Sequence, residues 1–198
     1  MSYSDLVTNL MAIFVLLFSM STLDAAKIDT VASEIQNRET DNLQELQKKI
    51  DEAIVANNLQ KDLRTTLDFE GLRVVFQGSA MFASASAELI PAHIERVSPI
   101  IDLVSKIDSR YQVSLEGHTD DVPLSVKKSA KFLDNWSLSS ARGVSLLQVL
   151  AKRGFPVERM NVGGYADTRP VVSPAGLTGT ALNEARAMNR RVVIRIYQ

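Results

Sequence analysis

The segment YQVSLEGHTD, at residues 111–120, sets the pattern of the second half of the chain. Val113 and Leu115 alternate with polar residues, which is the period of a strand with one buried face. Gly117 ends this alternation, and polar residues follow it at once. Binding groups collect where strands end in strand–helix folds, so we expect the loop beginning with His118-Thr119-Asp120 to carry a site.

Further strands and helices are predicted on both sides of this segment. The predicted strands are 71–76, 111–116, 160–164 and 191–197, and the predicted helices are 91–107 and 138–152. The first helix starts at a proline, and the second is stopped by Arg153-Gly154. This order predicts an α+β domain over residues 67–198, a βαβαββ sandwich with helices on one face of the sheet.

The composition of the whole chain excludes several classes of protein. The chain has 198 residues, a formal net charge of -1 and no cysteine. A near-neutral charge gives no basic excess for binding nucleic acid. The lack of cysteine excludes disulfide scaffolds, thiolate zinc sites and iron–sulfur clusters. With only two histidines as well, the sequence predicts no metal site.

The N-terminal segment carries a long uncharged run from Leu6 to Leu23. As a helix, this run would span roughly 27 Å, close to the bilayer hydrocarbon thickness of about 30 Å. Three interpretations compete: a buried helix of a soluble domain, a cleaved signal peptide and a retained transmembrane helix. The run shows little of a polar face and has no basic residue before it, which favours a single transmembrane helix within residues 1–26.

Asp5 stands at the beginning of this run, and Thr8 follows it by about one helical turn. In one interpretation, Asp5 is a carboxylate that stabilises the start of the helix. In the other, it is an ion-relay group, because ionisable side chains in membrane segments are usually functional. Position alone leaves both interpretations open.

Residues 27–66 contain no glycine or proline and are rich in glutamate, glutamine and lysine, so we predict a helical connector. Its apolar residues form two short stripes: Ile28, Val31 and Ile35, then Leu43, Leu46, Ile50, Ala53 and Ile54. Stripes this thin favour a coiled coil or a pair of helices in a dimer over packing on a large core. A solvated linker with partial helicity is the alternative.

No arrangement of residues typical of an enzyme is evident. Asp120 and Asp121 are adjacent, so in an extended strand they would point in opposite directions and could not share a proton. The sequence instead favours recognition. Asp120 at a strand end and Arg142 early in the next helix could bind the ammonium and the carboxylate of a zwitterion. Alternatively, Arg142 is an ordinary surface arginine that covers apolar area.

Four ordered blocks of residues resemble the OmpA C-terminal peptidoglycan-binding domain. They are Gly117-His118-Thr119-Asp120, Asn135-Trp136-Ser137-Leu138-Ser139-Ser140-Ala141-Arg142, Gly163-Gly164-Tyr165-Ala166-Asp167-Thr168-Arg169-Pro170 and Asn189-Arg190-Arg191-Val192-Val193-Ile194. The second block and the long loop before it resemble the MotB branch. The segment from Ser2 to Ala12 is similar to the Tyr-Ala-Asp-x-x-Thr-x-x-Met segment of MotB-type stator subunits.

The resemblance implies a homodimeric subunit of the bacterial inner membrane, with a short cytoplasmic N-terminus and the C-terminal domain in the periplasm. Its partner would be a multi-span MotA-like subunit, and no organic cofactor or nucleic acid is implied. Asp5, with Thr8, would carry the permeating ion, H⁺ or Na⁺. The segment from Asp24 to Ile35 corresponds to the place of a plug helix.

The resemblance also assigns residues to a wall-binding site. Asp120 and Arg142 would clamp the diaminopimelate of the peptidoglycan stem peptide. The supporting candidates are Thr119, Asn135, Leu138, Arg190 and Arg191. The implied function is that of a stator subunit, either of a flagellar motor or of a relative such as the Zorya anti-phage system. The alternative is a passive OmpA-like cell-wall anchor that conducts no ions.

Overall fold

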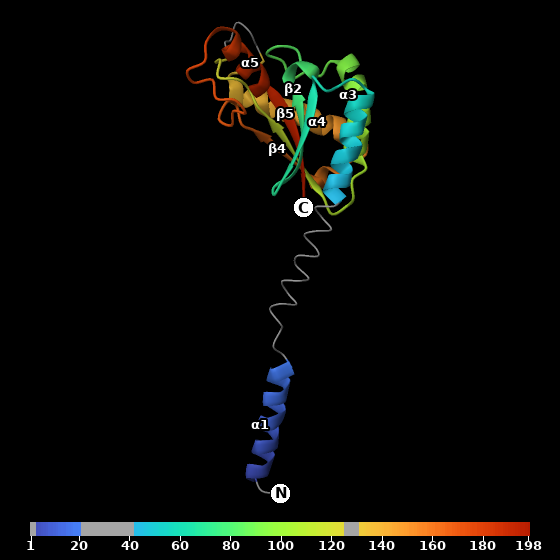
Figure 1. Ribbon diagram of the computed structural model, residues 1–198, viewed down its shortest axis with the longest axis vertical. Coiled ribbons are helices and arrows are strands. Elements are labelled where there is room, and N and C mark those ends of the chain that lie inside the picture. Colours follow the sequence, from blue (N-terminus) through green and yellow to red (C-terminus); the bar gives the residue numbers. More distant parts are fainter. Residues whose placement is uncertain (1–2, 21–41, 125–130) are drawn as a thin grey trace. The chain divides into compact units, whose positions relative to one another are not determined.

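The structure is a computed structural model that describes residues 3–20, 42–124 and 131–198 (Figure 1). The chain divides into two units, Met1–Asn42 and Leu43–Gln198. The predicted plug segment from Asp24 to Ile35 lies outside the described residues, as do residues 27–41 of the predicted connector.

The first unit contains one described helix, α1 (Tyr3–Met20). Large apolar side chains are exposed along it, among them Leu6, Leu10 and Phe14. The hydroxyl of Thr8 donates a hydrogen bond to the carbonyl of Ser4, one turn earlier. In the ranges that the structure describes, no helix combines the length and apolar content needed to cross a membrane.

The second unit is built on a five-stranded sheet with the order β1-β2-β5-β3-β4. The strands are β1 (Leu63–Asp68), β2 (Gly71–Gln77), β3 (Gln112–Gly117), β4 (Met160–Gly164) and β5 (Arg191–Tyr197). Only the β3–β4 pair is parallel; the other neighbours run antiparallel. The four predicted strands are confirmed to within a residue at either end.

The helices of this unit are a helix at residues 42–56, α3 (Pro91–Ser105), α4 (Asn135–Lys152) and α5 (Gly179–Asn189). The α3 and α4 predictions are confirmed. Helix α4 starts three residues earlier than predicted because Asp134 caps it: its carboxylate accepts a hydrogen bond from the backbone of Ser137 at 2.7 Å. Helix α5 was not predicted.

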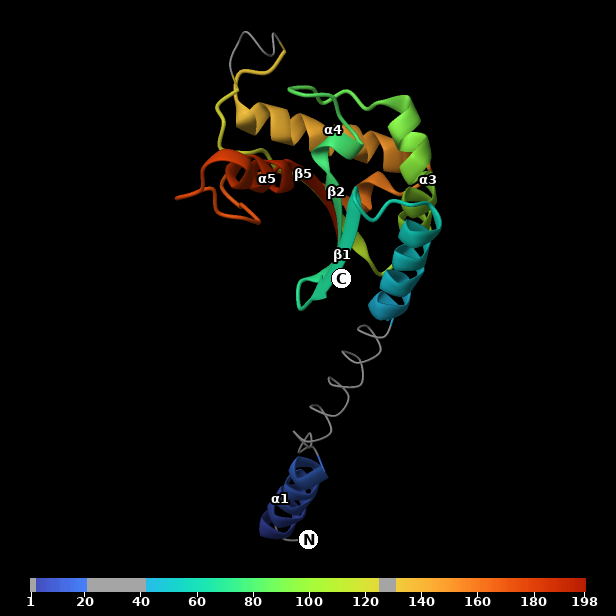
Figure 2. The same cartoon turned by 45° about the horizontal axis from the view of Figure 1, so that its top comes forward.

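Two expectations about the connector were wrong. Residues 63–66, predicted as part of the helical connector, instead belong to strand β1, because Leu63 and Leu67 alternate with polar residues opposite β2. The helix at 42–56 also packs on the core, where Ile50 and Ile54 are buried. This helix lies beside α3 at one side of the unit (Figures 1 and 2). It therefore needs only a thin apolar stripe to pack on the core. The folded unit therefore begins near residue 43 and not at 67.

The two faces of the sheet differ in character. One face is apolar and contributes Phe76, Leu115 and Ile194 to a core shared with α3, α4 and the helix at 42–56. The other face carries polar residues such as Arg73, Glu116 and Arg195. Apolar alternation along each strand produces this division, and the predicted placement of α3 and α4 on one face is correct.

Helix α4 approaches the sheet closely at two glycines. A Cβ on Gly117 would lie 2.0 Å from the carbonyl oxygen of Ser139, and a Cβ on Gly164 would lie 2.6 Å from the backbone nitrogen of Ser140. Both contacts involve helix backbone, which cannot rotate away as a side chain can. The first turns of α4 can therefore pack this closely on β3 and β4 only because Gly117 and Gly164 have no side chains.

We expect Gly117→Ala to destabilise the fold by about 1–3 kcal/mol, because the added methyl group must push α4 away from β3. Thermal unfolding of the full-length protein in detergent measures this change. Thr180→Ala, at an exposed position of α5, is the control and should change stability by less than about 0.5 kcal/mol. Equal stability of Gly117→Ala and wild type would show that the close approach does not constrain the helix.

Candidate functional site

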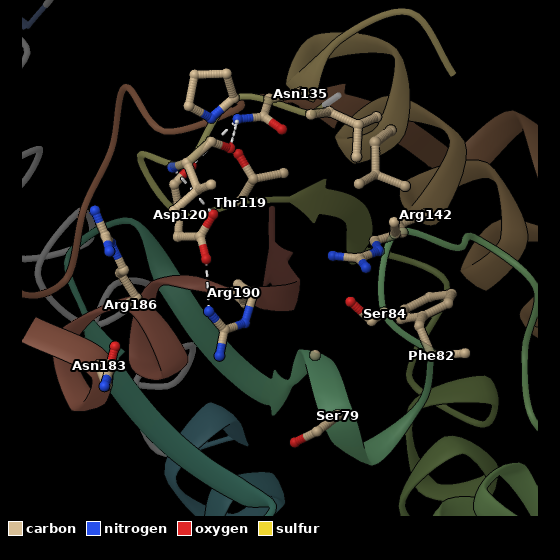
Figure 3. Close-up of a pocket in the computed structure, with 17 residues that line it drawn as sticks. Ser79, Phe82, Ser84, Thr119, Asp120, Asn135, Arg142, Asn183, Arg186 and Arg190 are labelled. Carbon is tan, nitrogen blue, oxygen red and sulfur yellow. Dashed lines mark hydrogen bonds and ion pairs between the residues drawn. The ribbon is translucent and has the colours of Figure 1, made fainter. Parts of the chain in front are cut away.

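A cavity of about 500 Å³ lies at the end of β3, between the start of α4, the loop after β2 and α5 (Figure 3). The residues that line it come from segments far apart in the sequence. Those with polar or aromatic side chains are Ser79, Phe82, Ser84, Thr119, Asp120, Asn135, Arg142, Asn183, Arg186 and Arg190. We call this cavity the wall-site cavity.

Hydrogen bonds to the backbone fix the loop that carries Asp120. The Asn135 side-chain amide donates to the carbonyls of Asp120 and Val122, at 3.3 and 3.0 Å. On the other side, the backbone nitrogen of Thr119 donates to the carbonyl of Ala166 at 2.8 Å. Asn135 is the first residue of α4, the helix that carries Arg142. Its hydrogen bonds therefore fix the loop with Asp120 relative to this helix.

Asp120 forms an ion pair across the cavity wall. Its Oδ2 lies 2.5 Å from Nη1 of Arg190, and its side chain is 13% exposed. Arg190 itself is 45% exposed and follows α5 directly. An ion pair with one partner this open to solvent is worth little, so the guanidinium of Arg190 can leave Asp120 when a ligand cation replaces it.

Arg142 lies on the opposite side of the cavity from Asp120 and Arg190 (Figure 3). Its residue is only 4% exposed, and its Nε donates to the carbonyl of Ser86 at 2.9 Å. Its guanidinium also lies over the ring of Phe82, with 5.2 Å between the guanidinium carbon and the ring centroid. Within the described residues, no carboxylate forms an ion pair with Arg142.

The electrostatics of Arg142 follow from this position. Burial lowers its pKa to about 10, the positive charge of Arg190 acts in the same direction, and Asp120 partly opposes both. The side chain therefore stays charged at neutral pH. A buried guanidinium without an anionic partner favours binding of an anion from outside.

A second ion pair borders the cavity. Arg186 of α5 donates two hydrogen bonds to the carboxylate of Asp121, at 2.7 and 2.8 Å. This bidentate contact lowers the pKa of Asp121. The pair ties α5 to the loop after β3.

Most of the predicted wall-site residues come together here. Thr119, Asp120, Asn135, Leu138, Arg142 and Arg190 all line the wall-site cavity. Arg191, the remaining candidate, does not line this cavity and lies instead in a different pocket on the polar face of the sheet. Asp5 and Thr8 belong to α1 in the other unit.

Sequence reasoning missed several lining residues: Ser79, Phe82, Asn183 and Arg186. Ser79 and Phe82 follow β2, and the small-residue loop there was the signal that could have drawn attention to them. Asn183 and Arg186 lie on α5, a helix that the sequence pattern did not reveal. Chemically, one carboxylate and several guanidinium groups around a cavity suit recognition of a charged ligand.

Two family models match the chain in order. Residues 1–38 match a family described as "Membrane MotB of proton-channel complex MotA/MotB". Residues 81–184 match the OmpA family, which is more than half of the chain.

Relatives match nearly the whole chain. An uncharacterised protein, YtxE of Bacillus subtilis, is 29% identical, with 98% of this chain and 85% of that protein covered. Motility protein B of the same organism is 25% identical, with 98% and 88% covered.

Solved structures show the same fold. A MotB-like protein from Desulfovibrio vulgaris superposes with a TM-score of 0.70 at 23% identity, with 83% of this chain and 99% of that one covered. The cell wall anchor of the type VI secretion system from Pseudomonas aeruginosa gives a TM-score of 0.61 at 27% identity, with 76% and 98% covered. The chain therefore belongs to the OmpA family, and it resembles the MotB-type proteins over both of its parts.

Proposed function

We propose that the chain is the peptidoglycan-anchored B subunit of an ion-driven motor complex of the MotA/MotB type. The observation that carries the wall-binding part is Arg142, a buried guanidinium without a carboxylate partner among the described residues, facing Asp120 across a cavity. The motor part is supported by the match of residues 1–38 to the membrane segment of MotB.

The ligand that suits the wall-site cavity is the free end of diaminopimelate in the peptidoglycan stem peptide. This group carries an ammonium and a carboxylate on one carbon. The carboxylate would accept hydrogen bonds from the free guanidinium nitrogens of Arg142, in the forked geometry that arginine offers. The ammonium would replace Arg190 at Asp120. Arg190, once released, would lie near the ligand carboxylate and add a second positive charge to it.

Arg142→Met should weaken the binding of the full-length protein to purified sacculi by roughly 10- to 100-fold, the loss typical of a charge-assisted hydrogen-bonded contact. Its unfolding midpoint should stay the same or rise, because the variant no longer buries an unpaired charge. Co-sedimentation with sacculi and thermal unfolding in detergent give the two readouts.

The control is Lys152→Gln, which removes a positive charge from the exposed end of α4. It should sediment with sacculi as the wild type does. A parallel loss of stability and binding in Arg142→Met would assign Arg142 a structural role and contradict the clamp.

Sacculi that contain lysine in place of diaminopimelate should bind about tenfold more weakly, because lysine offers an ammonium but no side-chain carboxylate. The Arg142→Met protein should bind the two kinds of sacculi equally. Asp120→Asn should instead reduce binding to both kinds. If wild type does not distinguish the two, the ligand is not the zwitterion.

The membrane part of the proposal assigns residues 1–26 to a single span whose Asp5 carries H⁺ or Na⁺. Thr8 would lie on the same face of α1 as Asp5, one turn along. Its hydroxyl, which donates to the Ser4 carbonyl, leaves its lone pairs available to a hydrated ion near Asp5. The C-terminal unit would lie in the periplasm, and a homodimer would assemble with a multi-span MotA-like partner, in a flagellar motor or in a relative such as the Zorya system.

Asp5→Asn should abolish ion flux through the complex co-expressed with its multi-span partner, because an amide cannot take up and release a proton or pair with a cation. Cytoplasmic pH and sodium reporters in the expressing cells measure the flux. Asp108→Asn, which removes a carboxylate from the loop before β3, should leave the flux intact.

A passive wall anchor is the second candidate, and the likeness to the cell wall anchor of the type VI secretion system favours it. In that case Asp5→Asn would have no effect in any cellular assay, while Arg142→Met would still release the protein from sacculi. The two experiments therefore separate the motor function from the wall-binding function.

A further inference from the structure

A second pocket lies on the polar face of the sheet, with a volume of about 450 Å³. It is lined by side chains of β1, β2, β3 and β5 together with the loop after β4, and we call it the sheet-face pocket. Its charged lining residues are Arg64, Glu70, Arg73, Glu116, Arg169, Arg191 and Arg195. None of the residues that line the wall-site cavity takes part in it.

Two of its arginines are neutralised by carboxylates. Arg73 and Arg195 stand directly opposite each other on β2 and β5, an arrangement that would be repulsive on its own. Glu70 pairs with both guanidinium groups, and Arg195 also contacts Glu116 at 3.0 Å. Arg73 has a further partner in Asp68, outside the lining.

The other three arginines form no ion pair with a carboxylate among the described residues, although the charge of Glu116 acts on Arg191 and Arg169. Arg191 donates to the backbone carbonyls of Asn189 and Arg169, at 3.2 and 2.9 Å. Arg64 donates at 2.8 Å to the side-chain oxygen of Gln77. In this orientation the side-chain nitrogen of Gln77 also donates, to the carbonyl of Ala187. Arg169 stacks on the ring of Tyr165, with its guanidinium carbon 3.7 Å from the ring centroid. The pocket therefore holds an excess of positive charge.

His118 adds unpartnered polar atoms at the same place. It is 2% exposed and lines the pocket, and neither of its ring nitrogens has a hydrogen-bond partner in the described structure. Its Nε2 lies 3.7 Å from Glu116, and its ring stacks on Tyr165 with 5.4 Å between centroids. Burial lowers the pKa of His118, and the charges of Arg191 and Arg169 act in the same direction, against Glu116.

We propose that the sheet-face pocket binds a phosphate group, with Arg64, Arg169 and Arg191 as the positive charges that hold it. Guanidinium groups bind phosphate oxygens in the same forked geometry as they bind carboxylates. Free phosphate can carry two negative charges and three acceptor oxygens, which suits three arginines without an ion pair better than a single carboxylate does. The phosphate could be free or part of a phosphodiester of an envelope polymer. A phosphodiester carries one negative charge and two unbridged oxygens on each phosphorus, and both ligands present phosphate oxygens to the guanidinium groups.

The test measures binding of inorganic phosphate and of a short glycerol phosphate oligomer to the full-length protein in detergent by calorimetry. We expect saturable binding of one phosphate group per chain. Arg64→Gln combined with Arg169→Gln should weaken it at least tenfold, and both residues are exposed, so the fold should survive. Lys152→Gln is the matched control, because it also removes a positive charge but does not line this pocket.

The two ligands distinguish the source of the phosphate. Tighter binding of the oligomer indicates a phosphodiester polymer, and equal or weaker binding indicates free phosphate. The proposal is wrong if neither ligand shows saturable binding, if the double variant binds as wild type does, or if succinate binds as tightly as phosphate. The double variant should also keep its binding to sacculi freed of phosphodiester polymers, so this outcome is independent of the wall-binding proposal.

A second measurement does not depend on a variant. The chain has only two histidines, His93 and His118. Addition of phosphate at constant pH should shift the imidazole NMR signals of His118, because a bound anion stabilises its protonated form, and should leave those of His93 in place. Equal shifts of both histidines, or no shift at His118 while phosphate binds, would place the anion elsewhere.

Discussion

The close contact between the backbone of α4 and two strand ends is the constraint on which the site depends. Gly117 and Gly164 have no side chains, so the first turns of α4 lie directly on the ends of β3 and β4. Ser139 in this turn is completely buried and accepts a hydrogen bond from the backbone of Ala166 at 3.1 Å. Ala166 in turn accepts one from Thr119. These contacts fix α4, β3 and the loops after β3 and β4 relative to one another. The charged residues of the wall-site cavity that these segments carry are therefore held in fixed positions.

Rigidity matters here because the central charge is held at an energetic cost. A buried guanidinium without an anion costs free energy in the empty protein, and only a fixed frame prevents it from turning outward to water. The hydrogen bond from Arg142 to Ser86 and the ring of Phe82 hold the side chain inward. A ligand carboxylate then meets a guanidinium that is already oriented, and little conformational entropy is lost when it binds.

The sequence pattern revealed the elements whose apolar period is strong and missed those stabilised by tertiary contacts. Strands β2, β3 and β5 and helices α3 and α4 each carry a period of two or of about 3.6, and the short β4 is marked by the turn residues around it. The β1 strand has only Leu63 and Leu67 to mark it, and its identity depends on pairing with β2. Helix α5 begins at Gly179 and buries only Ala185 and Asn189, so its sequence carries almost no apolar period, although it is rich in alanine and other helix formers. The site residues Asn183 and Arg186 were missed for this reason.

The neighbouring residues Arg190 and Arg191 show why some site residues cannot be assigned from sequence. They have the same chemistry, and a shift of one position along an extended chain moves a side chain to the opposite face of a sheet. Arg190 reaches the wall-site cavity, while Arg191 lies among the arginines of the polar face. The junction between α5 and β5 decides which is which, because Asn189 binds the backbone of Val171 and Val172 and fixes the direction of the chain there. The side-chain amide of Asn189 thus places the adjacent Arg190 and Arg191 in two different pockets. A substitution in one pocket can therefore change its ligand without changing the other.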